Sequence, residues 1–436
     1  MEAQPAMALP QRLAAVWDHL GIRTAHVATQ MPGDVAELIA VAPERVAGLV
    51  LCVPSRLDPA PFAGVAEHVL MIAGDGDLTD AVTARGLPRL PGAKRQVLVG
   101  YAAPGWADVV ADRTGSIAGW ISDFLGRFRA DTPHAAAPEG VVAGVSYRIQ
   151  GTGPALVLLP FFLAPSQWEP AIPLLARRFS VVTLSGRHLG GIAALEDRAR
   201  APSYRAMVRN LLSQMAPLPG ETILDIGSGS GALDRMVAQL WPDCGLTAVD
   251  VNPFLQREAK ALAAEAGLRD AIAFLPGSAE ALPFPDGSFD CVFSVTVLEE
   301  CDADRALREA WRVLRPGGRL GVGVRAIDLP QWWNLNLPER LRERANTPPQ
   351  SVAPRGVADA GLYRRMRAAG FSELVCSPSL VTLDQPDGPI WRYREDHVLS
   401  LLSPEETETW HALIAAARRD DVLMMAHPMH CAVGLK

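Results

Sequence analysis

The stretch TILDIGSGSG, residues 222–231, decides the fold of the second half of this chain. Its apolar start, residues 223–226, is typical of a buried parallel strand, and three alternating glycines follow it. Glycine lets the backbone turn sharply and approach a ligand closely. Residues 232–241 then predict a helix, whose N-terminus offers free N–H groups to polar ligand atoms. The pattern therefore indicates a strand, a ligand-binding turn and a helix in succession.

A second apolar strand, residues 246–250, ends in Asp250, which lies 23 residues after Gly227. A carboxylate at about this spacing binds the ribose in nucleotide-binding units built from two parallel strands and a helix. The two strands together predict a nucleoside cofactor. The glycine loop also satisfies the dinucleotide pattern G-x-G-x-x-A, so a nicotinamide dinucleotide is one alternative.

Three further motifs follow in order: GSAEALPFPDGSFD at residues 277–290, CVFSV at 291–295 and LRPGGRL at 314–320. With the glycine loop they resemble the class I S-adenosylmethionine-dependent methyltransferases, in particular the ubiquinone/menaquinone-biosynthesis-like small-molecule enzymes. The resemblance covers residues 203–436. It implies a Rossmann-like α/β domain with a seven-stranded, mostly parallel sheet. It also implies S-adenosyl-L-methionine as cofactor and methyl transfer to an O, N or C atom of a small molecule. A non-catalytic nucleoside-binding assembly or regulatory protein is the competing hypothesis.

The resemblance assigns roles to residues of these motifs. The glycines would shape the loop around the methionine part of the cofactor, Asp225 would orient its ammonium group, and Asp250 would accept the ribose hydroxyls. Ser278 stands where the family usually has an acid for the adenine amino group. Two structural alternatives remain, because Asp225 could cap the loop and Asp250 could be a helix N-cap. The predicted cofactor-binding residues are Asp225, Gly227, Ser228, Gly229, Gly231, Asp250, Val251, Ser278, Ala279 and Ser294.

The acceptor side offers three candidates for a catalytic base. Glu300 follows the fourth predicted strand, at a position where the family often has histidine, and it is the first candidate. His430 and His427, in the closing HPMHCAVG segment, are next. A general base adds about 10²–10⁴-fold when the acceptor carries a proton to be removed. Each histidine could instead pack within a strand.

Two other features of the last hundred residues carry alternatives. A metal could bind His427, His430 and Cys431, but a spacing of three on a strand places the two histidines on opposite faces, so no metal site is predicted. Trp332 and Trp333 could stack on a planar or cationic acceptor, or could pack a core.

Composition narrows the classes of function. The chain has 436 residues, of which 49% are hydrophobic and 20% charged, so it is predicted to be globular and to have more than one domain. A net charge of −7 without a basic cluster argues against nucleic-acid binding. The longest apolar run, residues 155–164, contains a proline and is too short to span a membrane. No secretory leader is recognised, and six scattered cysteines suit free thiols, so we expect a cytoplasmic protein. The expected partner is a small-molecule methyl acceptor, and the sequence leaves open whether the protein forms a homodimer.

The first two hundred residues resemble an α/β-hydrolase whose halves are in swapped order. Alternating helix and strand patterns at 1–130 resemble the C-terminal half of that fold, and residues 140–200 resemble its N-terminal half. Residues 131–139, DTPHAAAPE, would be the linker that joins the old ends. The methyltransferase domain would then occupy residues 201–436.

The hydrolase-like part lacks the residues of a working catalytic triad. A hydrolase needs a serine on a strained turn, an acid and a histidine. Here Gln30 occupies the serine position, and an amide cannot serve as the acyl nucleophile. The acid survives as Asp75 or Asp77, but residues 100–106 contain no histidine, and residues 160–164 lack the glycines expected of an oxyanion loop. We therefore predict a non-catalytic accessory domain.

Overall fold

The computed structural model describes residues 7–76, 78–102, 109–135, 137–161, 165–186, 188–350, 352–384 and 389–436. The chain divides into two compact units, residues 1–193 (unit 1) and 194–436 (unit 2). The division falls within helix α7 (Gly190–Arg200), a few residues before the expected domain start at 201. In the described part of the chain, no helix has both the length and the apolar character needed to cross a bilayer.

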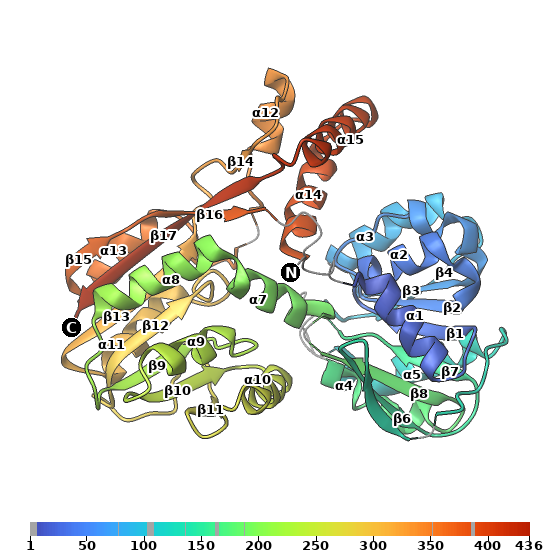
Figure 1. Cartoon of the computed structure of the whole chain (residues 1–436), viewed down its shortest axis with the longest axis horizontal. Helices are drawn as coiled ribbons and strands as arrows, with labels where there is room; N and C mark the ends of the chain where they lie inside the picture. Colours follow the sequence, from blue (N-terminus) through green and yellow to red (C-terminus); the bar gives the residue numbers. More distant parts are fainter. Residues whose placement is uncertain are drawn as a thin grey trace, which may run out of the picture. The chain divides into compact units, whose positions relative to one another are not determined.

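Unit 1 contains an eight-stranded sheet in the order β4-β3-β2-β1-β7-β8-β6-β5 (Figure 1). The first four strands of the chain form one side of the sheet and the next four form the other, joined by the parallel pair β1–β7. Each half of the sequence is thus contiguous in the sheet. The strands are β1 (Ala25–Thr29), β2 (Val46–Cys52), β3 (Val69–Ala73), β4 (Lys94–Val97), β5 (Glu139–Val142), β6 (Val145–Gln150), β7 (Ala155–Leu158) and β8 (Ser180–Ser185).

Helices cover both faces of the sheet of unit 1. Between residues 109 and 125 the chain forms two helices, α4 and α5, rather than one. Between residues 165 and 175 it forms only the short elements η4 and α6, because Pro170 and Pro173 interrupt the helical hydrogen bonds. The helical elements are α1 (Leu9–His19), α2 (Pro32–Val41), η1 (Pro43–Arg45), η2 (Ala60–His68), α3 (Leu78–Gly86), η3 (Leu87–Arg89), α4 (Val109–Asp112), α5 (Thr114–Leu125), η4 (Pro165–Trp168) and α6 (Ile172–Leu175).

Unit 2 contains a nine-stranded sheet rather than the expected seven-stranded one. Five parallel strands follow the order β11-β10-β9-β12-β13, and β17 runs antiparallel to β13. The chain closes in one long strand, β17. Two short strands, β15 and β16, pair with the edge of β17 opposite β13, and β14 pairs with the β13 edge beyond the end of β13, which explains the larger number. The strands are β9 (Thr222–Ile226), β10 (Gly245–Asp250), β11 (Ile272–Pro276), β12 (Phe289–Val295), β13 (Leu314–Arg325), β14 (Trp332–Trp333), β15 (Ser372–Cys376), β16 (Ser379–Leu383) and β17 (Met425–Leu435).

Two hydrophobic layers sandwich this sheet. Helices α8 (Pro202–Met215), α9 (Ala232–Leu240) and α10 (Pro253–Glu265) pack on one face, and α11 (Ala303–Val313) and α13 (Gly361–Ala368) on the other. Side chains alternate along β9, so Ile223 belongs to the first layer and Leu224 to the second. Helices α12 (Glu339–Ala345), α14 (Pro389–Leu401) and α15 (Pro404–Arg419) form a separate cluster beyond β14 (Figure 1).

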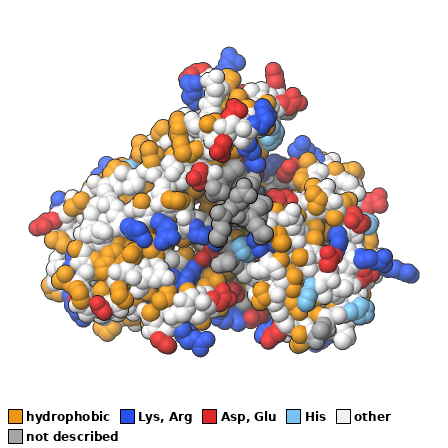
Figure 2. Space-filling model, in the orientation of Figure 1, with side chains coloured by type: hydrophobic (Ala, Val, Ile, Leu, Met, Phe, Trp, Pro, Cys, Tyr) orange, Lys and Arg blue, Asp and Glu red, His pale blue; other side chains and the backbone are white. Residues whose placement is uncertain are grey.

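The surface of the protein carries charges of both signs. On the face shown in Figure 2, acidic and basic side chains of the described residues are interspersed among apolar ones. The charged groups that matter for the site below lie instead inside unit 2, among them Asp225 at 2% exposure and Asp234 at 0%.

Candidate active site

The glycine loop turns as the sequence predicts. Gly227, Gly229 and Gly231 have φ values of 84°, 55° and 72°, a region that L side chains rarely adopt. At Gly227 the space is also closed, because an added Cβ would lie 2.2 Å from Val297 Cγ2. The loop therefore requires glycine at its first position for both conformation and room. The helix that follows, α9, begins at Ala232.

Asp250 ends β10 beside this loop. Its Oδ2 accepts the Gly229 N–H at 2.9 Å, and its Oδ1 accepts the Asn252 N–H at 2.9 Å. Burial raises the pKa of Asp250, although these N–H groups oppose the shift. The N-cap of α10 is Asn252, which accepts from Phe254 N at 2.9 Å and Leu255 N at 3.0 Å, so the N-cap alternative for Asp250 is wrong. Val251 is 74% exposed at the rim.

Asp225 faces a second buried acid that the sequence did not single out. Asp234, on the first turn of α9, is 0% exposed, and within the described chain neither of its carboxylate oxygens has a hydrogen-bond partner. Burial and the charge of Asp234 raise the pKa of Asp225 well above its ordinary value, and burial raises that of Asp234 to about 7. Two adjacent buried carboxyl groups resist ionisation in this way, so they keep a proton to a higher pH than an isolated acid does.

We expect Asp234→Asn to stabilise unit 2 at neutral pH. As the pH rises from 3.8 to about 7, the unfolded chain loses a proton that the folded chain keeps, so stability falls across this window. An amide removes that loss and can donate a hydrogen bond to Asp225. Thermal melts between about pH 5 and about pH 8 should show a flatter profile for the variant than for wild type. The matched change at the exposed Asp270 should leave the profile unchanged, and a lower melting temperature of Asp234→Asn at neutral pH would contradict the raised pKa of Asp234.

The other predicted cofactor residues occupy the same strand ends. Ser228 is 8% exposed, and its buried Oγ has no partner among the described residues. Ser278 Oγ accepts the Glu280 N–H at 3.2 Å, and Ala279, next to it, is half-buried. Ser294 is 1% exposed, and its Oγ donates to Ile226 O at 2.9 Å. The Ser294 hydroxyl thus joins β12 to the end of β9.

The turn after β12 is strained and acidic. Thr296 has φ 61°, which is a genuine outlier for a β-branched residue, and such strain clusters at functional sites. Glu299 is 1% exposed and accepts the Arg325 N–H at 2.6 Å. The Glu300 side chain is 44% exposed, and its Oε1 lies 3.9 Å from Arg325 Nη2. Burial raises the pKa of Glu300, and the positive charge of Arg325 opposes this shift. Of the two acids, Glu300 is the one that an acceptor can reach.

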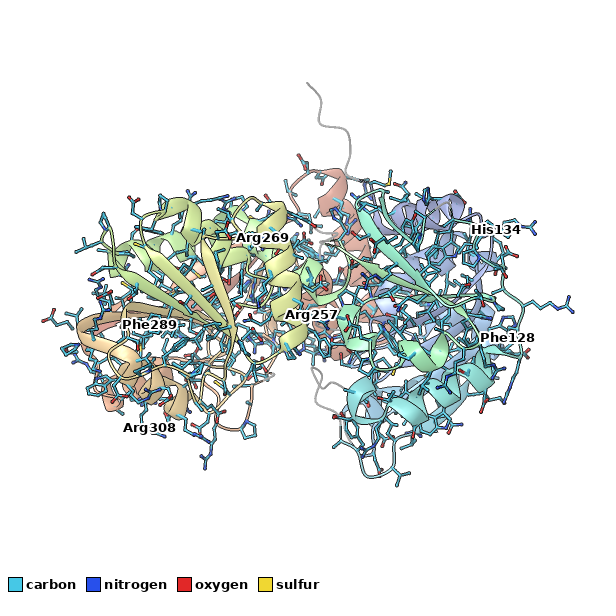
Figure 3. All side chains as sticks on the ribbon, turned by 90° about the horizontal axis from the view of Figure 1, so that it is seen from below. Phe128, His134, Arg257, Arg269, Phe289 and Arg308 are labelled. Atoms are coloured by element: carbon cyan, nitrogen blue, oxygen red, sulfur yellow. The ribbon has the colours of Figure 1, made fainter. Side chains whose placement is uncertain are left out.

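The two histidines of β17 lie on opposite faces, as their spacing predicts. Figure 3 labels Arg257 on α10 and Arg308 on α11, two helices that cover opposite faces of this sheet. His430 lies on the α11 face, with Nδ1 2.8 Å from the Tyr363 hydroxyl and Nε2 2.9 Å from Asp328 Oδ1. Both ring nitrogens of His430 are therefore engaged.

His427 lies on the α8 face and is 4% exposed. Its buried Nδ1 has no partner among the described residues. Burial, then the charges of Arg394 and Arg198, hold the pKa of His427 well below its ordinary value, so the ring is neutral. No cluster of three or more metal-ligating side chains occurs in the described ranges.

The tryptophan pair divides between surface and core. Trp333 is 2% exposed, donates from Nε1 to Ala345 O at 2.9 Å and makes edge contacts with Trp391 and Trp410 at 5.2 and 4.9 Å. Trp333 is therefore a core residue of the α14–α15 cluster. Trp332 is 46% exposed.

In unit 1, the position expected for a nucleophile holds a structural amide. Gln30 is 3% exposed, its Nε2 donates to Val53 O at 3.2 Å, and it is not among the described residues with positive φ. The strained serine turn of a hydrolase is thus absent at this described position. Asp75 accepts the Gly100 N–H at 2.8 Å. Asp77 and most of the segments at 100–106 and 160–164 lie outside the described residues.

Comparison with known families identifies the part of the chain that holds this site. Residues 224–322 match the family model described as "Methyltransferase domain". Unit 2 contains a class I methyltransferase domain. The match begins inside β9 and ends inside β13, so it includes the glycine loop, Asp250 and the turn after β12. S-adenosyl-L-methionine is the cofactor of this class.

Curated relatives match the same region. The chain is 39% identical over 121 residues to the "Ubiquinone/menaquinone biosynthesis C-methyltransferase UbiE" of Hahella chejuensis, which covers 27% of this chain and 49% of that protein. It is 36% identical over 105 residues to the protein of the same name from Escherichia coli, a match that covers 24% of this chain and 42% of that protein. The chain therefore spans less than half of the length of either relative.

The chain also matches solved structures, with TM-scores below 0.5. The YcgJ protein of Bacillus subtilis is 20% identical with a TM-score of 0.37, covering 53% of this chain and 98% of that one. A geranyl diphosphate methyltransferase solved in complex with SAM is 21% identical with a TM-score of 0.34. The match covers 56% of this chain and 90% of that one.

Proposed function

We propose that the protein transfers a methyl group from S-adenosyl-L-methionine to a small molecule. The observation that carries this proposal is the meeting of the glycine loop with Asp250 at the carboxyl ends of β9 and β10, which is where nucleotides bind in open parallel sheets. Each Asp250 oxygen accepts one N–H and keeps a lone pair for a ribose hydroxyl.

The remaining cofactor contacts follow from this placement. Asp225 would face the ammonium group of the methionine part. The free Oγ of Ser228 would bind a polar group of the same part, within the turn that the three glycines form. Ser278 and the Ala279 N–H would meet the adenine beyond Val251. Ser294 would support the loop through Ile226 rather than touch the cofactor.

For the acceptor side we propose Glu300 as the base, because its carboxyl group is partly exposed next to the strained Thr296. Neutral His427 is the second candidate, since its Nδ1 is open. His430 is less suited, because both of its nitrogens are already hydrogen-bonded. The matched relatives are named C-methyltransferases, so carbon is the first acceptor atom to test, before oxygen and nitrogen.

For unit 1 we propose a non-catalytic accessory domain derived from an α/β-hydrolase by exchange of its halves. Two observations support this history: each half of the sequence occupies one side of the sheet, and the joining segment passes along the start of β1, where Asp131 accepts the Arg23 N–H at 2.8 Å and the Thr24 N–H at 3.2 Å. The bonded Gln30 amide supports the absence of esterase chemistry.

Thermal melts with a panel of nucleosides test the cofactor assignment. S-adenosylhomocysteine should raise the melting temperature, because a ligand that binds only the folded state stabilises it, whereas NAD⁺ and NADH should not. Stabilisation by the dinucleotides instead would contradict the proposal. Binding of S-adenosylhomocysteine without methylation of any tested acceptor would favour the non-catalytic alternative.

A further inference from the structure

Arg394, on α14, is a buried cation without a counter-ion. Its side chain is 4% exposed, and its Nη1 donates to Gln331 Oε1 at 2.9 Å, while its buried Nε has no partner in the part of the chain that the structure describes. Among the residues that the structure describes, no carboxylate forms an ion pair with it. A desolvated charge without a partner is costly, so such a position favours the entry of an anion.

Three more groups of unit 2 surround the same point. Arg325 and His427 line, with Arg394, a cavity of about 10 Å³. Arg198, on α7, is close enough to add to the lowering of the pKa of both His427 and Arg394. We define Arg198, Arg325, Arg394 and His427 as the cationic cluster. Within the described ranges, Glu299 and Glu300 both pair with Arg325, at 3.5 and 3.9 Å, and neither forms an ion pair with Arg394.

The cationic cluster lies at the edge of the sheet where the cofactor is proposed to bind. Arg325 is the last residue of β13, and β17 runs antiparallel to it, so His427 near the start of β17 lies at the same edge. Tyr204 lies on α8 and is buried. Among the described residues its hydroxyl has no partner, and its pKa is raised by burial and by the charges of Glu299 and Asp225.

We propose that the cationic cluster binds a carboxylate group of the methyl acceptor, an inference that rests on the proposed function. A carboxylate is the anion that fits best. The cavity has room for about one water-sized atom, so one carboxylate oxygen can enter it between Arg394 and His427. The other oxygen then points to Arg325, whose side chain is 16% exposed. Guanidinium groups bind planar carboxylates through paired hydrogen bonds, whereas a tetrahedral phosphate needs more space.

A matched pair of ligands tests this site in the full chain saturated with S-adenosylhomocysteine. Benzoate and benzamide have the same shape and differ in charge, and inorganic phosphate is the third arm, all at constant ionic strength. Benzoate should raise the melting temperature saturably, and benzamide and phosphate should not. Arg394→Gln keeps a donor for Gln331 but loses the charge, and should weaken benzoate binding by at least about tenfold. Arg355→Gln, which removes an exposed arginine, should leave it unchanged.

The variants also separate a binding role from a structural one. Removing an uncompensated buried charge should leave the ligand-free melting temperature of Arg394→Gln equal to or above that of wild type. If that variant unfolds, Arg198→Gln on α7 should still weaken benzoate binding several-fold. Equal effects of benzoate and benzamide, or benzoate binding unchanged in both variants, would overturn the inference. Stabilisation by phosphate through Arg394 would overturn the carboxylate assignment. Failure of S-adenosylhomocysteine to bind, with benzoate binding intact, would count against the proposed function alone.

Discussion

Replacing Gly227 by alanine is expected to abolish binding of S-adenosylhomocysteine and to destabilise unit 2. The added methyl group would lie 2.2 Å from Val297 Cγ2, and φ at this position is 84°. Val297 is β-branched and cannot rotate away freely. Backbone strain and overpacking together cost roughly 2–4 kcal/mol, and relief of the clash would displace the turn that the cofactor requires. Calorimetric titration and thermal melts measure the two effects.

Gly267 offers a matched control for this substitution. It has φ 72°, but an added Cβ there would meet nothing within 4 Å. Gly267→Ala should therefore show the cost of backbone strain alone and should keep cofactor binding. In a double variant, Val297→Ala should recover part of the stability lost in Gly227→Ala, because the two nearest atoms are removed. Equal losses in Gly227→Ala and Gly267→Ala would contradict the steric explanation.

The second large effect is expected for Asp250→Ala, which should weaken S-adenosylhomocysteine binding by about a hundredfold. Two hydrogen bonds from ribose hydroxyls to a carboxylate contribute about 3 kcal/mol in total, which corresponds to that factor. The substitution also removes the acceptor for the Gly229 and Asn252 N–H groups, both at 2.9 Å, so the loop loses support. Isothermal titration measures the change in Kd.

Two variants separate ribose binding from loop support. Asp250→Asn keeps an oxygen for one N–H group and should give an intermediate loss of affinity. Asp270→Ala removes an exposed acid from the same unit and should change neither the affinity nor the melting temperature. Unchanged affinity in Asp250→Ala would mean that the nucleoside binds elsewhere.

The sequence predicted the backbone of the glycine loop well because that backbone depends on local patterns. A strand followed by glycines at fixed spacing allows few backbone geometries, and the φ values of Gly227 and Gly231 match it. Asp250 follows from the length of one strand–helix–strand unit. The histidines of β17 fall on opposite faces because side chains alternate along any strand.

The acceptor side could not be predicted in the same way because it forms from distant segments. Arg394 stands on a helix with no distinguishing pattern, and only the tertiary fold buries it without a counter-ion. Asp234 is an acid on the first turn of the helix after the glycines, and the sequence gives little reason to single it out. Its closeness to Asp225 depends on how α9 packs. The strain at Thr296 has no sequence signature, since it arises where the chain leaves β12.

The number of strands was underestimated for a related reason. Because β17 is long, β15 and β16 pair along its edge opposite β13 and β14 pairs with it beyond the end of β13, and these short segments gain strand structure only by pairing with β17. A two-residue strand such as β14 has no period that a sequence can display.

The most direct test of the central claim is a crystal structure of the protein with S-adenosylhomocysteine. We expect both ribose hydroxyls within hydrogen-bond distance of the Asp250 carboxylate, the homocysteine part against the glycine loop, and the sulfur facing the turn after β12. A ligand found away from the ends of β9 and β10, or a glycine loop closed against it, would contradict the account.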